Sequence, residues 1–246
     1  VCSSDLRFSE GTWSLGTRGP VTLRIGEVEN LVTARNITAD LQGDYPWTED
    51  NPLLLTNVKV ETLGGKITMQ QLRMPQHDPA LLRVDNISSS ELISAVNPKQ
   101  FAMSGPVSGA LPFWLDNEKW IIKDGWLTNP GPMTLRIDKD TADAIVKDNM
   151  VAGAAINWLR YMEISRSWTR INLDNLGELT MQATIKGTSR VDGKSSSVNL
   201  NYTHDENVFT LWRSLRFGDN LQTWFEQHAA IPAPRSLTGK ESEEQQ

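Results

Sequence analysis

The chain has very little cysteine and no long hydrophobic run. Its 246 residues contain one cysteine, Cys2, which excludes an internal disulfide and a cysteine-rich zinc site. The best candidate for a membrane span, Met150–Leu159, is ten residues long and contains Asn157. A span needs about 18 or more apolar residues. Positive charge is also scarce, since 24 Lys and Arg against 30 Asp and Glu give a net charge of −6. We therefore expect no nucleic-acid partner, because that affinity requires clustered basic side chains.

Catalytic motifs are scarce as well. The three histidines, His77, His204 and His228, lie far apart and form no ligand pair with helical spacing. The segment Gly105–Gly109 contains a serine but fails the Gly-x-Ser-x-Gly spacing of a nucleophile elbow. The chain has no Gly-x-Gly-x-x-Gly and no P-loop, so nucleotide binding has no support. We expect neither an enzyme nor a cofactor, although a hydrolase site assembled in space from these histidines stays open.

What the chain does contain is alternation of apolar and polar side chains. Period two predicts strands with one apolar and one polar face, and the short Gly-, Asn-, Asp- and Pro-containing connections favour antiparallel hairpins. In Leu31–Leu41 we expect every second residue, Arg35 and Ile37 included, to share one face. The other segments with this pattern are Val21–Ile25, Leu53–Thr62, Ile67–Gln71, Met133–Ile137, Ile171–Leu173, Leu179–Ile185 and Val198–Tyr202.

Four segments have helical spacing. Asp85–Val96 contains a short helix that Ser88 to Ser90 can cap and that ends before Pro98. A central helix is expected over Thr141–Met162. Two amphipathic helices are expected near the end of the chain, at Asp205–Arg216 and Asp219–Ala230. The fold class is therefore mainly β with α, of the α+β type.

The two ends of the chain differ from the rest. Val1–Leu6 carries no initiating methionine, and its back-translation reads like the end of a common sequencing adapter. We therefore predict that residues 1–6 are not native and that the natural protein extends further upstream. Residues 231–246 follow two prolines and are polar, which predicts a mobile tail.

Nine tryptophans against three tyrosines is an unusual ratio. One interpretation is that the indoles pack against the sheet as core or turn anchors. The other is an interfacial or lipid-facing role, because indole combines a large apolar body with one polar N–H.

Several longer motifs resemble the YdbH family. The most specific are the segments Ser104–Leu115 (SGPVSGALPFWL), Asp124–Arg136 (DGWLTNPGPMTLR), Asn157–Met162 (NWLRYM) and Leu211–Asn220 (LWRSLRFGDN). The upstream segments Asn36–Leu41 and Leu63–Ile67 are similar to the repeating part of the same family. The resemblance covers about Phe8 to Ala230 and divides the chain into a β-groove segment, 7–103, and a YdbH-type C-terminal domain, 104–230.

The resemblance implies an AsmA-like protein of the Gram-negative envelope. Such proteins are anchored in the inner membrane near their N-terminus, and their periplasmic portion is a long, curved, largely antiparallel β-groove thought to carry phospholipid. For this chain that implies a C-terminal fragment whose inner-membrane anchor is missing, with one central helix and two C-terminal helices beside the groove. The family is also associated with a small outer-membrane lipoprotein, YnbE-like, that adds strands to the C-terminal end.

Two sets of residues follow as candidates, one for lipid and one for a partner strand. Either set could equally serve an ordinary core. The chain is then a lipid-conducting segment or, alternatively, a non-conducting scaffold that recruits a lipoprotein by β-augmentation. The lipid-groove candidates are Leu23, Ile25, Ile37, Val58, Val60, Ile67, Met69, Leu135 and Ile137. The partner-strand candidates, on two possible edge strands, are Leu179, Met181, Ile185, Val198, Leu200 and Tyr202.

Overall fold

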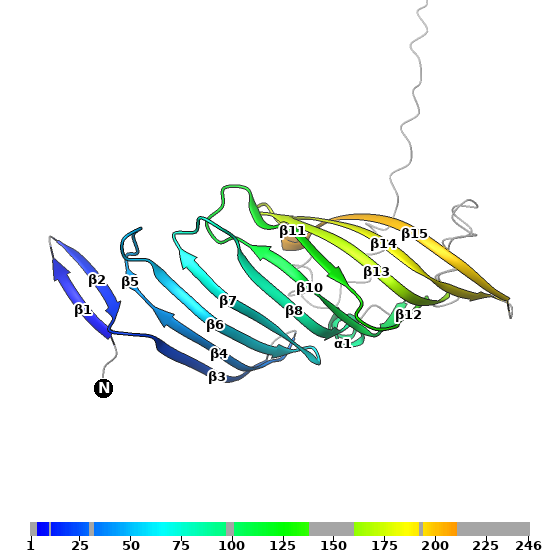
Figure 1. Cartoon of the computed structure of the whole chain (residues 1–246), viewed down its shortest axis with the longest axis horizontal. Coiled ribbons are helices and arrows are strands. Elements are labelled where there is room, and N and C mark those ends of the chain that lie inside the picture. The colour runs from blue at the N-terminus through cyan, green and yellow to red at the C-terminus, as the bar shows by residue number, and fades with distance from the viewer. Residues whose placement is uncertain are drawn as a thin grey trace, which may run out of the picture.

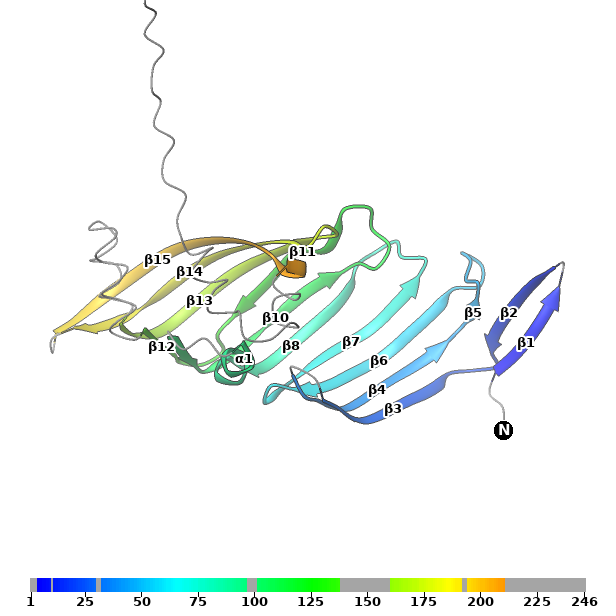
Figure 2. The same ribbon diagram turned by 180° about the vertical axis from the view of Figure 1, so that it is seen from behind.

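The computed structural model describes residues 4–9, 11–29, 32–96, 101–137, 160–191 and 194–210. These residues form one long open antiparallel sheet, a small sheet at its upstream end and one helix (Figures 1 and 2). In chain order the elements are β1 (Ser4–Ser9), β2 (Thr12–Thr17), β3 (Val21–Val28), β4 (Ala34–Gln42), β5 (Asp44–Tyr45), β6 (Leu53–Thr62), β7 (Gly65–Met74), β8 (Ala80–Ser88), α1 (Ser89–Val96), β9 (Phe101–Ser104), β10 (Pro106–Phe113), β11 (Trp120–Thr128), β12 (Met133–Ile137), β13 (Tyr161–Asp174), β14 (Glu178–Val191) and β15 (Lys194–Asn207).

The long sheet follows the chain almost strand by strand. Its order is β15-β14-β13-β11-β10-β8-β7-β6-β4-β3, and β12 and β9 continue it beside β13. The small sheet, β1-β2-β5, is joined to it through Thr17 and Gly43, whose backbone N–H and C=O are 3.0 Å apart. The expected hairpins and meanders are therefore confirmed. In the described part of the chain, β3 and β15 end the main strand order, and β9, which pairs with β12 alone, ends the side branch.

Asparagine and aspartate interrupt four of the strands in the left-handed backbone conformation. The residues are Asn36 in β4, Asn57 in β6, Asn86 in β8 and Asp124 in β11, with φ between 49° and 55°. Short polar side chains tolerate this region because they bond locally. Polar groups of the neighbouring strand bind each one: Asn57 Nδ2 donates to Asp40 at 2.9 Å, and the Asp124 N–H donates to Asn172 Oδ1 at 2.8 Å. Each residue marks a β-bulge that shifts the alternation by one position.

These bulges correct the face assigned to Arg35. Strict alternation over Leu31–Leu41 predicts that Arg35 and Ile37 lie on the same face. In the structure Arg35 pairs with Glu27 and Glu61, whereas Ile37 pairs with Ile25, and Asn36 lies between them. The extra residue moves Arg35 to the polar side of β4.

The short helix is confirmed at its expected start. The N–H of Glu91 donates to Ser88 Oγ at 3.3 Å, so Ser88 caps α1. The other helix predictions are tested only in part. Tyr161 and Met162 begin β13 instead of ending a helix, and 205–207 complete β15 before helical residues 208–210. Outside the described residues lie the rest of the regions predicted at Thr141–Met162 and Asp205–Arg216, the whole helix predicted at Asp219–Ala230, and the tail at 231–246.

Candidate functional site

One face of the long sheet is apolar from edge to edge. Residues that pair directly across antiparallel strands lie on the same face, so the register gives the face of every side chain. We call this surface the apolar face. It is defined by the pairs Ile25–Ile37, Leu41–Leu55, Val58–Met69, Val60–Ile67, Ile67–Val84, Leu82–Leu111, Leu135–Met162, Ile171–Met181 and Ile185–Leu200.

All fifteen candidate residues lie on this face. The lipid-groove candidates Leu23, Ile25, Ile37, Val58, Val60, Ile67 and Met69 occupy β3, β4, β6 and β7, and Leu135 and Ile137 occupy β12. The partner-strand candidates Leu179, Met181, Ile185, Val198, Leu200 and Tyr202 occupy β14 and β15. The two sets therefore form one continuous surface, although their roles stay predictions.

The opposite face is polar over most of the sheet. On β3, β4 and β6 it presents Thr22, Asp40, Thr56 and Lys59, and on β14 it presents Gln182 and Thr184. Asp40 accepts hydrogen bonds from Thr22 Oγ1 at 2.8 Å and from Asn57 Nδ2 at 2.9 Å. These bonds hold the pKa of the Asp40 carboxyl below its usual value, the Asn57 bond contributing most. We call this surface the polar face.

The apolar face is buried in two places. One cluster contains Met133, Met162, Ile164 and Val198, with Leu135, Ile185 and Leu200 packed against it. The other contains Met69, Leu72 and Ala80, with Leu55, Val58 and Phe113 beside them. Several candidates thus belong to a core, as the alternative interpretation allowed.

Elsewhere the same face is open. Leu23 is 43% exposed and Ile25 is 50% exposed on β3. A half-exposed row of aliphatic side chains is apolar surface that a bound hydrocarbon can cover.

The candidate edge strands have different positions. β14 lies between β13 and β15 and pairs with both along its length, so Leu179–Ile185 cannot supply a free edge and that expectation is wrong. β15 pairs with β14 alone among the described strands. Val198 and Leu200 belong to or pack against a core cluster, so what β15 leaves unpaired among the described strands is its backbone edge rather than these side chains.

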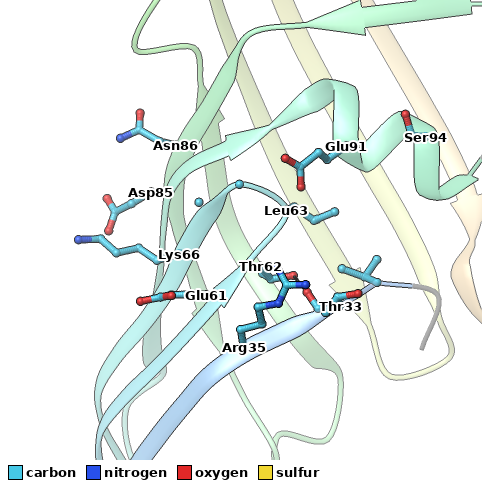
Figure 3. A pocket seen from close by; sticks show the side chains of 13 residues that line it. Thr33, Arg35, Glu61, Thr62, Leu63, Lys66, Asp85, Asn86, Glu91 and Ser94 are labelled. Atoms are coloured by element: carbon cyan, nitrogen blue, oxygen red, sulfur yellow. Dashed lines mark hydrogen bonds between the residues drawn. The ribbon is translucent and has the colours of Figure 1, made fainter. Parts of the chain in front are cut away.

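A hollow lies beside the ends of β4, β6, β7 and β8, next to α1 (Figure 3). Its volume is about 890 Å³, and five charged side chains line it. Four of them follow one another across the strands as register partners, in the order Arg35, Glu61, Lys66, Asp85. The fifth, Glu91, comes from α1. Sequence reasoning missed this hollow, because its walls come from three separate parts of the chain.

Two tryptophans lie on neighbouring strands of the long sheet, β11 and β13. Trp126 and Trp168 are on the polar face and stack with their ring centroids 5.0 Å apart and their planes at 12°. Trp168 is 49% exposed. They are neither part of a core cluster nor on the apolar face.

The described residues show no arrangement of catalytic groups around the histidines. His77 bonds Glu49 at 2.8 Å, and His204 contacts Tyr202 at 3.1 Å and Glu206 at 3.8 Å. Within the described part, no three His, Cys, Asp or Glu side chains come together as metal ligands. His228 lies outside it. No helix in the same part has the length and apolar character that crossing a bilayer requires.

Comparison with known proteins gives two matches and one negative result. The chain matches the family described as "YdbH-like: Intermembrane phospholipid transport protein YdbH" over residues 3–230. It is 77% identical over 240 residues to "Probable phospholipid transport protein YdbH" of Escherichia coli (strain K12). That alignment covers 98% of this chain and 27% of the relative, so the chain spans about a quarter of the relative's length. No solved structure matches the chain.

The match begins inside the residues predicted to be non-native. Ser4–Leu6 belong to β1 and pair with β2, and Asp5 binds Arg18 at 2.7 Å. The non-native origin of residues 1–6 and the division at residue 103 stay predictions. The family match covers most of the chain and agrees with the relative. The chain therefore belongs to the YdbH-like family.

Proposed function

We propose that this chain is the C-terminal segment of an envelope protein that conducts phospholipids between the inner and outer membranes. The acyl chains lie on the apolar face, and the polar face meets water. The names of the family and of the relative support phospholipid as the cargo. In this proposal the segment is periplasmic, and the longer protein is anchored in the inner membrane upstream.

The observation that carries the proposal is the continuity of the apolar face. The apolar face extends through every strand of the long sheet from β3 to β15. No strand along the way presents only polar side chains on this face. Each buried methylene contributes about 0.8 kcal/mol, so an acyl chain needs a long apolar track rather than a single pocket. Movement along such a track breaks no bond and requires no catalytic group.

Photo-crosslinking from matched neighbours tests the proposal. A benzophenone amino acid replaces Leu23 or Ile25 on the apolar face, or Thr22 or Arg24 on the polar face of the same strand. All four positions are on β3, so exposure to solvent and distance from the sheet edge are similar. We expect phospholipid adducts from the first pair at least several-fold above those from the second.

Equal adduct yields from both faces would contradict the proposal. Circular dichroism of each variant controls for folding. Mass spectrometry of the adduct identifies the lipid, so that a detergent or a fatty acid is not mistaken for the cargo.

One observation favours a second function, which is a scaffold that recruits a small outer-membrane lipoprotein of the YnbE-like kind. β15 is an edge of the described sheet, and an edge can accept a strand from another chain. In that case Val60→Asp on the apolar face preserves envelope function, whereas Asn201→Pro in β15 abolishes it. If acyl chains use the apolar face, Val60→Asp itself impairs function.

A further inference from the structure

Around its two stacked tryptophans, the polar face is basic. Arg166, Trp168 and Arg170 are alternate residues of β13, so their side chains share this face. Lys186 on the neighbouring strand β14 is the register partner of Arg166 (Figure 1). These three cations are exposed, and none of them has a carboxylate oxygen within 4.0 Å among the described residues. They are therefore open to a ligand, in a chain whose net charge is −6.

Carboxylates mark the margins of this basic region. Asp205 of β15 enters the register one row beyond Arg170, in line with Asn172 and Thr180. At the other end of β13, Glu163 lies 3.5 Å from Arg190. The excess of positive charge is thus confined to the rows that contain the tryptophans and their nearest neighbours on β13 and β14.

Hydrogen-bonding side chains adjoin the exposed tryptophan on the same face. Thr184 and then Asn201 follow Trp168 across β14 and β15, and Gln182 is the register partner of Arg170. All three are exposed, and Thr184 Oγ1 donates to Asn201 Oδ1 at 3.0 Å. These rows of β13, β14 and β15 therefore offer hydroxyl, amide and guanidinium groups, and they contain no aliphatic side chain.

The two indoles add apolar surface that is held in place. Trp126 is in register with Arg170, and Trp168 is in register with Thr128, so the two indoles are diagonal neighbours on adjacent strands. Stacking at 5.0 Å fixes their orientation, yet 49% of Trp168 stays exposed. An aromatic side chain that is already ordered loses little conformational freedom when a ligand stacks on it.

Two kinds of ligand combine negative charge with apolar contact: an anionic membrane surface and an anionic glycan. A membrane is bound by apolar side chains that insert below the headgroups. Here the exposed indole lies among polar groups, which do not favour insertion. A glycan fits these groups better, because the C–H face of a sugar ring stacks on indole, its hydroxyls bind amides, and its carboxylates bind guanidinium groups.

We propose that this surface, the basic patch of Arg166, Trp168, Arg170 and Lys186, binds the carboxylate-bearing glycan of the cell wall. Trp168 stacks on a sugar ring, and the three cations bind carboxylates. The choice of the cell wall as the source rests on the periplasmic location in the proposed function. The assignment adds a second ligand, on the face of the sheet opposite to the one that carries lipid.

Sedimentation with insoluble polymers tests the assignment. The full chain is mixed with purified peptidoglycan sacculi, with sacculi whose carboxylates have been converted to neutral amides, and with chitin, whose N-acetylglucosamine rings carry no charge. An exposed ion pair changes Kd by about two- to fivefold, so the loss of three pairs should weaken binding roughly tenfold. We therefore expect untreated sacculi to bind about tenfold more tightly than either neutral polymer.

Substitutions separate the two parts of the patch. Trp168→Ala should weaken binding to untreated sacculi about fivefold, and Trp168→Phe should keep most of it, because a phenyl ring still stacks. Arg166→Gln and Arg170→Gln in one chain should weaken binding to untreated sacculi and leave binding to amidated sacculi unchanged. Matched controls are Trp13→Ala, which removes an indole that is 60% exposed, and Arg24→Gln, which removes an exposed cation on the polar face of β3. Both should bind like the unsubstituted chain.

Equal binding to untreated and amidated sacculi overturns the assignment, as does unchanged binding in Trp168→Ala. Tighter binding to phosphatidylglycerol vesicles or to lipopolysaccharide than to sacculi also overturns it, in favour of a membrane surface. Circular dichroism checks folding, and if Trp168→Ala is unfolded, the double arginine variant decides. Failure to sediment with sacculi overturns this assignment alone, because lipid capture at Leu23 reports on the opposite face.

Discussion

The two ends of the apolar face have the same pattern of side chains and very different surroundings. At the downstream end, Met162 is completely buried and Ile164 is 4% exposed, among Met133 and Val198. At the upstream end, Leu23 and Ile25 are 43% and 50% exposed on the edge strand β3. Both sets lie on one face of one sheet.

The difference comes from what lies beside each strand. The end of β13 that contains Met162 has β12 on one side and β14 on the other, and β9 continues the sheet beyond β12. β3 pairs with β4 alone among the described strands. Alternation therefore specifies a face, whereas the neighbouring elements decide whether that face is a core or an open surface.

Alanine substitutions at the two ends should separate these roles most strongly. We expect Met162→Ala to lower the free energy of unfolding by about 2–5 kcal/mol, because it leaves a cavity in a packed cluster. Ile25→Ala should lower it by about 1 kcal/mol, since half of the side chain is already exposed. Urea denaturation followed by circular dichroism measures both.

Lipid capture should respond to the two substitutions in the opposite order, with the larger loss at Ile25. Capture from a benzophenone at Leu23 should fall in Ile25→Ala and stay unchanged in Met162→Ala under conditions where that variant is folded. Similar losses of stability at the two positions would show that the upstream end is also a core.

The apolar face could be predicted from the sequence, but its continuity could not. Leu53 and Leu55 are odd-numbered and Val58 and Val60 are even-numbered, so strict alternation puts the two pairs on opposite faces. The bulge at Asn57 restores the two pairs to one face, since Leu55 and Val58 both pack against the cluster around Met69. The apolar positions change from odd-numbered to even-numbered at an asparagine, and that change indicates a bulge. Counting every second residue alone does not detect it.

Bulges in the two regions can be compared directly by substitution. Asn57→Val places a β-branched residue at φ 53°, and Asp124→Val does so at φ 55°. A left-handed backbone costs an L-residue about 1–2 kcal/mol, so each variant should lose roughly that much stability. Asn57→Gly and Asp124→Gly should lose less, since glycine adopts this conformation freely. Thermal unfolding of the four variants measures the effect.

A much larger loss for one of the two valine variants would mean that the bulge matters more in that region. If Asn57→Gly lost as much stability as Asn57→Val, the side-chain hydrogen bond to Asp40 rather than the backbone conformation would explain Asn57. Asp124→Gly keeps the backbone N–H that donates to Asn172, so it reports the backbone conformation alone.

Other features of the site depended on long-range pairing, which a single sequence does not specify. β14 and β15 have equally good strand patterns, and only the sheet order shows that β14 is interior. The hollow unites segments near 33–35, 61–66 and 85–94. Trp126 and Trp168 are 42 positions apart and stack because β11 pairs with β13. By contrast, the cap at Ser88 is a local interaction, and it was predicted.

The smallest effect that we expect comes from a carboxylate on the polar face at the upstream end. Asp40 receives hydrogen bonds from Thr22 and Asn57, which lower the pKa of its carboxyl in the folded chain. A lowered folded-state pKa stabilises the fold above the unfolded pKa of about 3.9, and this stabilisation is lost as the pH falls through the folded value. Asp40→Asn should therefore be slightly less stable than the unsubstituted chain at pH 7.

In urea denaturation series at pH 7, 5 and 3, the difference in stability should persist at pH 5 and shrink at pH 3. Asp50→Asn is the matched control, because Asp50 is an exposed carboxylate on the loop between β5 and β6. If Asp40→Asn matched the unsubstituted chain at every pH, these bonds would not stabilise the edge, and the open upstream end would depend on backbone pairing alone.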